Sequence, residues 1–163
     1  MNWPRIILDG LSMSLLFNAV AGLGFLLVPQ AYSVMFPKEI KEAAAPYVEK
    51  KDVRTMHLII TPLYILLPVY WAVSAHFAGI TGFRTLFWTG FIEMTIVSIS
   101  DFLILDSWLP GKISHMIKGA EHCKAWQRKE WLTKLAIPEH FLLWPLIVCP
   151  LTGLITAGIG IIL

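Results

Sequence analysis

Residues 83–108 read FRTLFWTGFIEMTIVSISDFLILDSW, a largely apolar stretch that carries the carboxyl groups of Glu93, Asp101 and Asp106. A helix of this length crosses the roughly 30 Å hydrocarbon core of a bilayer at about 1.5 Å per residue. Lipid offers no hydrogen bonds to the backbone, so an apolar block of this length must be helical inside a membrane. The stretch therefore predicts a transmembrane helix that places acidic side chains inside the bilayer.

The composition of the whole chain indicates the same class of protein. Of its 163 residues, 56% are hydrophobic and 15% are charged, whereas soluble domains carry about 25% charged residues. Three further apolar blocks have comparable lengths, which gives predicted spans at 6–29, 55–78, 83–108 and 138–162. We predict an all-α polytopic membrane protein, a single four-helix transmembrane domain with two cytoplasmic loops that contain short interfacial helices.

The distribution of basic residues predicts the orientation of this domain. Of the 13 Lys and Arg residues, all but Arg5 and Arg84 lie in the two long loops, residues 30–54 and 109–137. Short cytoplasmic loops carry an excess of Lys and Arg. We therefore expect an integral protein of the cytoplasmic membrane with both loops in the cytoplasm and both termini outside.

The second loop contains aromatic and aliphatic residues at near-helical spacing among lysines and arginines. Trp126, Trp131, Leu132 and Leu135 form this pattern, which predicts an interfacial amphipathic helix within 116–135, bound to anionic membrane lipid. A solvated loop with a few packed tryptophans is the alternative. The charges of the chain are mixed and moderate, so nucleic acid is not expected as a partner.

The three acids of the third span lie at different predicted depths. Glu93 falls near the middle of the membrane, Asp101 roughly 10 Å inside the cytoplasmic end, and Asp106 near that interface. At about 100° per residue, Glu93, Ser100 and Asp101 share one sector of the helix, whereas Asp106 points about 140° away from Asp101. A carboxylate at such depth must face the bundle interior, find a partner or hold a proton.

Other polar residues are predicted to lie at the same end of the bundle. His57 follows Arg54 at the start of the second span, Glu139 and His140 open the fourth, and Asn18 lies deeper in the first. We expect this set to converge with the acids of the third span in the cytoplasmic half. On the opposite side His76 and Arg84 are expected to stand nearly alone.

This set supplies the candidate site. The candidate catalytic residues are Asp101, Glu93, His140 and His57, and the candidate substrate-binding residues are Asn18, Asp106, Glu139, Arg54, Ser100 and Trp108. A purely structural role is the alternative, in which a buried Asp101 pair with His57 or His140 only fixes the helix register. No metal site is predicted, because the spacing of His115, His122 and Cys123 matches no metal-binding motif, and no cofactor is indicated.

Several segments resemble a group of small bacterial four-span membrane proteins. They are MFPKEIKEAA after the first span, DFLILDSW at the end of the third, and a Gly-rich last span that ends in LTGLITAGIGIIL. Members of the group carry Tyr/Phe-Pro-Lys-Glu-Ile at the first position and an Asp-x4-Asp-Trp-like segment at the third. The matching positions are Pro37, Lys38, Glu39, Asp101, Asp106 and Trp108. Ser107 separates the second aspartate from the tryptophan, a one-residue departure. The resemblance implies the four-span fold, and the group has no assigned activity.

Three functions remain open from the sequence. In the first, the cluster is an active site for acid/base chemistry on a lipophilic molecule such as an isoprenoid or sterol, with Asp101 and Glu93 as acids and His57 or His140 as base. In the second, the protein is a small proton- or cation-coupled carrier that works as a homo-oligomer through Glu93. In the third, it is a non-enzymatic membrane subunit whose loops, including residues 38–54, bind a cytoplasmic protein.

Overall fold

The structure is a computed structural model that describes residues 1–108 and 110–163. Four helices in these residues are long and apolar enough to cross a membrane, which confirms the predicted class of fold. The first three are α1 (Trp3–Leu27), α4 (Lys50–Phe77) and α5 (Phe83–Asp101), which continues as a π-helical segment, Phe102–Asp106. The fourth comprises α7 (Arg128–Trp131), two π-helical segments (Leu132–Ala136 and Glu139–Val148) and α8 (Cys149–Ile162). Leu109, the first residue of the predicted second loop, lies outside the described residues.

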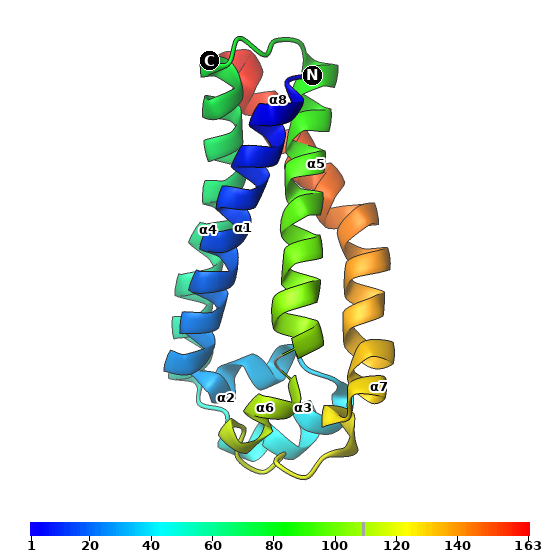
Figure 1. The fold of residues 1–163 in the computed structure, drawn as a ribbon. Helices are drawn as coiled ribbons and strands as arrows, with labels where there is room; N and C mark the ends of the chain where they lie inside the picture. The colour runs from blue at the N-terminus through cyan, green and yellow to red at the C-terminus, as the bar shows by residue number, and fades with distance from the viewer. Residues whose placement is uncertain (109) are drawn as a thin grey trace.

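The four long helices run up and down as one bundle (Figure 1). Both chain termini lie at one end, here called the terminal end, and the two long loops lie at the other, here called the loop end. A short turn after α4 closes the terminal end, and it uses Gly79 and Gly82 at φ values of +66° and +85°. Glycine has no Cβ, so it adopts these left-handed conformations without steric cost.

Small residues allow the central helix α5 to pack closely on its neighbours. A Cβ placed on Gly10 of α1 would come within 2.7 Å of Ile96, and one on Gly153 of α8 within 2.7 Å of the Phe87 carbonyl oxygen. Gly90 of α5 faces Thr156 of α8 in the same way. Close backbone approach at small residues is the usual packing of membrane helices.

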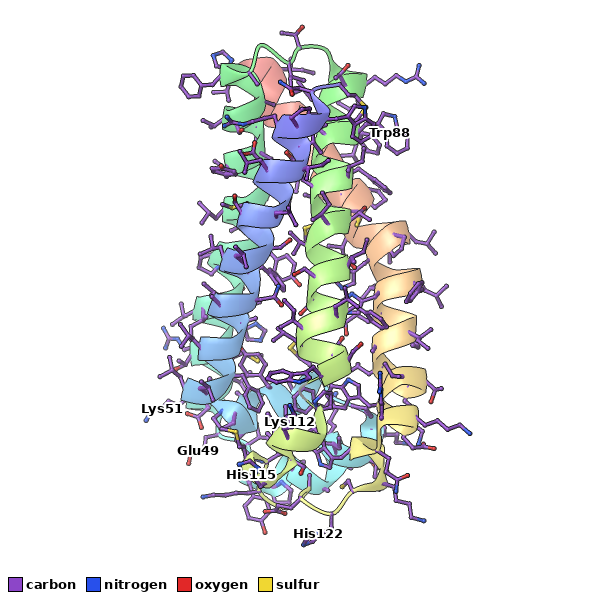
Figure 2. The ribbon with its side chains drawn as sticks, in the orientation of Figure 1. Glu49, Lys51, Trp88, Lys112, His115 and His122 are labelled. Atoms are coloured by element: carbon purple, nitrogen blue, oxygen red, sulfur yellow. The ribbon has the colours of Figure 1, made fainter. Side chains whose placement is uncertain are left out.

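The outer surface of the long helices is apolar. Large side chains such as Leu15, Leu27, Phe77 and Leu146 are mostly exposed on it. Figure 2 shows labelled polar residues gathered at the loop end, among them Lys51, Lys112, His115 and His122. Exposed apolar surface of this extent is not sustained in water, and in a bilayer it would contact lipid.

The two long loops fold together into a compact layer, here called the loop cap and defined as residues 28–49 and 110–131. It contains α2 (Pro29–Tyr32), α3 (Lys38–Ala44), α6 (Pro110–Ile113) and the 3-10 turns Ser33–Met35, Ala45–Tyr47, Ser114–Met116 and Lys124–Trp126. Side chains of both loops share one hydrophobic core, including Ile40, Ile113 and Ile117.

Two polar side chains of the first loop bind the backbone of the second. The Gln30 amide accepts a hydrogen bond from the Lys118 N–H at 2.9 Å and donates one to the Lys118 carbonyl oxygen at 3.2 Å. The Glu39 carboxylate accepts hydrogen bonds from the N–H groups of Lys124 at 2.9 Å and Ala125 at 3.1 Å. These contacts hold the two halves of the loop cap in register.

The predicted amphipathic helix within 116–135 is wrong in its extent and in its exposed aromatic face. The segment is divided between a 3-10 turn and the start of the fourth long helix. Trp126 and Trp131 are buried in the loop cap, where their rings stack at 5.4 Å and both contact Phe36 of the first loop. The packed tryptophans of the alternative are what the structure contains, and they pack against protein.

Candidate functional site

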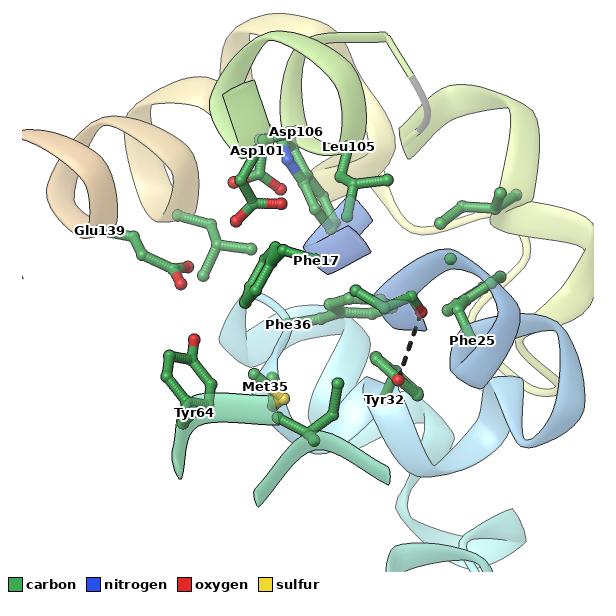
Figure 3. A pocket seen from close by; sticks show the side chains of 16 residues that line it. Phe17, Phe25, Tyr32, Met35, Phe36, Tyr64, Asp101, Leu105, Asp106 and Glu139 are labelled. Carbon is green, nitrogen blue, oxygen red and sulfur yellow. Dashed lines mark hydrogen bonds between the residues drawn. The ribbon is translucent and has the colours of Figure 1, made fainter. Parts of the chain in front are cut away.

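A partly open cavity of about 120 Å³ lies at the loop end of the bundle, beneath the loop cap. Its walls come from all four long helices and from both halves of the cap. The residues that line it are Phe17, Ala21, Gly22, Phe25, Tyr32, Met35, Phe36, Ile60, Tyr64, Asp101, Leu105, Asp106, Ile113, Trp131, Leu135 and Glu139 (Figure 3). Both the membrane spans and the loop cap therefore form the wall of the cavity.

Most of the cavity wall is aromatic or aliphatic, and its acidic groups lie on one side. Figure 3 shows the carboxyl groups of Asp101 and Asp106 side by side, with the carboxyl group of Glu139 on the same side of the cavity and the Tyr64 hydroxyl below it. Tyr32 belongs to the opposite, apolar part. Burial raises the pKa of Tyr32 to about 12, so its hydroxyl stays protonated and donates a hydrogen bond to the Ala21 carbonyl oxygen at 3.3 Å.

His140 binds the two aspartates from behind the cavity wall. Its Nε2 lies 2.8 Å from Asp106 Oδ2 and 3.7 Å from Asp101 Oδ2. Its Nδ1 lies 2.9 Å from Ser98 Oγ. An ionised carboxylate only accepts, so Nε2 donates to Asp106, and the Ser98 hydroxyl then donates to Nδ1 of the neutral ring. The hydroxyl can instead accept from a charged ring, so His140 keeps both partners when it gains or loses a proton.

The π-helical end of the third span brings Asp106 to this site. A regular α-helix was predicted to turn Asp106 about 140° away from Asp101, and this prediction is wrong. In the segment Phe102–Asp106 the Ser107 N–H bonds to the Phe102 carbonyl, five residues back. The i→i+5 pattern places residues five apart near one another around the helix, and Asp101 and Asp106 have that spacing. Both carboxyl groups consequently reach His140.

A second π-helical segment, Glu139–Val148, holds His140 in place. The Cys149 N–H bonds to the Trp144 carbonyl, again five residues back, within a segment where Pro145 has no N–H to donate. The rings of His140 and Trp144 stack at 5.3 Å, and Phe102 packs edge-on against the imidazole at 5.5 Å. The indole N–H of Trp144 points at Glu139 Oε1 at 3.4 Å. The imidazole is thus fixed by rings as well as by hydrogen bonds.

Asn18 and Ser100 lie beside this site without lining the cavity. The Asn18 amide donates to Ser100 Oγ at 2.9 Å and to the Ser14 carbonyl oxygen at 2.8 Å. The Asn18 side-chain oxygen is buried without a partner among the described residues. This pair joins α1 to α5 beside Phe17 and Asp101, which line the cavity.

His57, Arg54 and Trp108 do not join the site. His57 and Arg54 are exposed on the outer side of α4, where they border a shallow apolar groove with Leu58 and Thr61. Trp108 is 62% exposed, and the Lys112 ammonium lies 3.5 Å from the centre of its ring. The prediction that His57 converges with Asp101 is therefore wrong, and Arg54 and Trp108, predicted as substrate-binding residues, do not line the cavity. The inner face of a lipid-exposed helix cannot be read from its apolar pattern.

Glu93 also lies apart from the cavity. It is 1% exposed, its Oε2 has no hydrogen-bond partner among the described residues, and the charged groups that act on it are Asp9 and Arg5. The shared sector of the helix had grouped it with Asp101, whereas its charged neighbours, Arg5 and Asp9, belong to the half of the bundle nearer the termini.

A cluster that the sequence interpretation missed lies in that half. Arg5 donates to the buried Asp9 carboxylate at 2.8 Å, Ser74 donates to the same carboxylate, and the Tyr70 hydroxyl donates to it at 3.2 Å. The expectation that only His76 and Arg84 stand on this side is wrong. A usable signal was present, since Arg5 and Asp9 have the i,i+4 spacing of a helical ion pair at the start of an apolar block.

The sequence interpretation also missed five residues of the site: Ser98, Tyr64 and the cap residues Met35, Phe36 and Trp131. Ser98 and Tyr64 are ordinary small polar and aromatic residues of a span, and the cap residues enter only through the folding of the loops. Among the described residues, no three His, Cys, Asp or Glu side chains are arranged to hold a metal ion.

No protein-family model, curated protein or solved structure matches the chain.

Proposed function

We propose that the protein is an integral membrane enzyme that transfers protons to and from a lipophilic substrate bound in the loop-end cavity. The observation that carries this proposal is the position of three carboxyl groups on one side of an otherwise apolar cavity. One of them, Asp106, is hydrogen-bonded to the His140 imidazole, and a second, Asp101, lies 3.7 Å from the same nitrogen. A largely apolar cavity with a few convergent polar groups is the usual form of a small-molecule site.

The residues have distinct roles in this proposal. Asp101 protonates one carbon of a double bond, which leaves a cation on the other carbon, and Glu139 removes a proton from the next carbon beyond that cation. Asp101 is then ionised and Glu139 is protonated. The net change is a shift of the double bond, which balances without a redox cofactor. His140 is a positioning residue: it holds Asp106 beside Asp101 and returns protons to the aspartates.

The size of the cavity favours a chain-like substrate over a rigid one. A cavity of about 150 Å³ holds a benzene-sized molecule, so the 120 Å³ here accommodates about one five-carbon unit. Met35 and Tyr64 line the cavity and are also partly exposed, which leaves a path for the rest of the molecule. Of the two lipophilic classes considered, an isoprenoid chain fits this arrangement better than a sterol ring system.

The test is conversion of polyisoprenoid substrates by the purified protein in lipid nanodiscs, followed by exchange of substrate hydrogens in deuterated water. We expect deuterium incorporation by the parent protein and its loss in Asp101→Asn and Glu139→Gln. Glu42→Gln, an exposed change in the loop cap, is the matched control and should retain the parent rate. Exchange that persists in both site variants would exclude these carboxyl groups as the acid and base.

The membrane orientation is part of this proposal. The basic residues of the loop end, shown in part in Figure 2, support a cytoplasmic loop cap and external termini. Cys123 lies in the cap and is partly accessible, whereas Cys149 is buried. A membrane-impermeant thiol reagent should label Cys123 only after cells are made permeable, with Cys123→Ser as the control. Labelling of Cys123 in intact cells would show the opposite orientation, with the loop cap outside the cell.

A carrier is the second candidate, and the Arg5–Asp9 cluster is the observation that favours it. This cluster and Glu93 supply buried polar groups in the half of the bundle opposite the cavity, and a proton path across the membrane needs groups in both halves. In this reading Glu93→Gln abolishes proton-linked uptake in proteoliposomes while the exposed change Glu42→Gln does not. Uptake that is equal in both variants would remove the carrier from consideration.

A further inference from the structure

The acidic groups around the cavity outnumber the basic ones. Asp101, Asp106 and Glu139 line it, and no Lys, Arg or His side chain of the described residues does so. His140 behind the wall can offset one negative charge at most. Several carboxylates in a low-dielectric site cannot all ionise without further compensation. The cavity therefore favours either protons on its acids or a positive charge within it.

Asp101 is the group that most needs such compensation. It is 9% exposed, and its carboxylate accepts no hydrogen bond from any residue that the structure describes. Its closest counter-group, His140 Nε2, is 3.7 Å away and is already bound to Asp106 at 2.8 Å. Buried polar groups in proteins are nearly always paired. Asp101 thus has no hydrogen bond and only a distant ion-pair partner that it shares with Asp106, so its position at the cavity favours a further partner inside the cavity.

The aromatic residues of the cavity point to the same kind of partner. The rings of Phe17, Phe36 and Tyr64 line it together with Trp131, and Figure 3 shows Phe17 between the acids and the apolar side. Aromatic faces attract cations, and aromatic enclosures with nearby carboxylates are suited to alkyl-substituted ammonium groups. A metal ion would require a set of close oxygen or nitrogen ligands, which the described residues do not present.

We propose that the cavity binds the positively charged, alkyl-substituted end of a lipophilic molecule, such as a protonated tertiary amine. This inference rests on the proposed function, because it concerns the same cavity. It adds that the species stabilised there is positively charged. Protonation of an isoprenoid double bond creates a cationic end of the same size. An enzyme binds the charge that develops in its transition state more tightly than the neutral substrate, so a stable amine would act as its mimic.

The experiment compares two probes of equal shape in nanodiscs that contain the purified protein. N,N-dimethyldodecylamine is cationic at neutral pH, and 2-methyltetradecane is its uncharged isostere. Native mass spectrometry and the thermal unfolding midpoint report binding as each probe is raised in mole fraction. We expect the amine to half-saturate the protein at about tenfold lower mole fraction than the alkane, the preference of a partly desolvated cation–π and carboxylate site.

Charge-removing variants locate the binding. Asp101→Asn and Glu139→Gln should each weaken amine binding by about tenfold and leave alkane binding unchanged, while the exposed Glu42→Gln should behave like the parent. Equal binding of the two probes would overturn the proposal, and so would amine binding that none of the site variants weakens. If Asp101→Asn does not fold, as judged by its extracted yield, Glu139→Gln carries the same comparison.

The result is separable from that of the proposed function. Amine binding that depends on Asp101, together with no deuterium exchange in any isoprenoid, would retain the cation site and reject the enzyme. Deuterium exchange that the amine does not inhibit would support the enzyme proposal and reject the proposal that the cavity binds a cation. Exchange inhibited by the amine at the mole fraction that saturates binding supports both.

Discussion

His140 shows how one side chain can couple several groups inside a membrane helix bundle. Both ring nitrogens bond to the third span, which carries Ser98 and the aspartates, whereas His140 itself belongs to the fourth. Ring stacking on Trp144 fixes the plane of the imidazole, so each nitrogen has one direction in which to bond. A group held in this way can change its protonation state without moving, which a proton-transfer site requires.

The hydroxyl of Ser98 is expected to contribute to stability as well as to proton transfer. Replacement of Ser98 by alanine leaves the buried Nδ1 of His140 without a partner. We expect the free energy of unfolding to fall by about 1–3 kcal/mol, the usual cost of an unsatisfied buried polar atom. Thermal unfolding in detergent measures this.

The matched control for Ser98 is Ser12→Ala. The Ser12 hydroxyl bonds only to the Leu8 carbonyl oxygen of its own helix turn, and its loss should leave the unfolding midpoint close to that of the parent. Equal midpoints for the two variants would mean that the Ser98 bond to His140 carries no stability.

Helix geometry decides which residues of the third and fourth spans meet. The π-helical segments change the angle between successive side chains, so Asp106 and His140 occupy positions that a regular helix would not give them. π-helical turns occur often at functional sites. Elsewhere the same helices are regular, and there their contact depends on small residues, as at Gly90 against Thr156.

The α5–α8 contact predicts the effect of added volume. A methyl group on Gly90 would collide with the Thr156 side chain, so Gly90→Ala should lower the free energy of unfolding by about 1–3 kcal/mol. Gly158→Ala is the control, because a Cβ there meets nothing within 4 Å. That change should be neutral or stabilising by about 0.5–1 kcal/mol, since alanine favours a helix over glycine. Unfolding in a denaturing detergent mixture separates the two results, and similar destabilisation of both variants would argue against close packing at Gly90.

At the scale of the whole molecule, the loop cap and the four spans form one unit. The cap supplies part of the cavity wall, and its own core is as well buried as that of the bundle. Loops that only connected the spans would need no such core. The cap therefore closes one end of the bundle and shapes the site beneath it.

Gln30 tests how far the two halves of the cap depend on each other. Gln30→Leu removes both hydrogen bonds to the Lys118 backbone and leaves its N–H and carbonyl groups without those partners. We expect faster limited proteolysis within residues 116–127, because local opening exposes the backbone to cleavage. Gln127→Leu, at an exposed position, is the control. Equal cleavage rates would show that the two loops hold together without Gln30.

Much of the fold could be predicted from the sequence, and the reasons are physical. The length and apolar character of the four blocks require helices in lipid, and Asp101, Asp106 and His140 were grouped correctly by depth. The outward placement of His57 and Arg54 could not be foreseen. In a membrane helix the lipid-facing side is as apolar as the buried side, so periodicity does not identify the inner face.

The remaining differences arise where distant segments meet. The burial of Trp126 and Trp131 depends on Phe36 in the other loop. The approach of Asp106 to His140 depends on a π-helical turn, which no residue pattern in the sequence predicts. Glu93 and Asp101 lie on the same helix, and their surroundings differ because Arg5 and Asp9 of the first span lie near Glu93. These features depend on tertiary contacts, which cannot be predicted from one segment of the sequence at a time.

The composition of the cavity wall also sets the order in which the site can be completed during synthesis. Its first contributing residue is Phe17 and its last is Glu139, so more than three quarters of the chain must leave the ribosome before the wall can close. Until then the first loop lacks the second half of its core, and the acids of the third span lack His140. In the nascent chain these groups lack their final partners until the fourth span has been made. Contacts between segments that are distant in the sequence form slowly in folding.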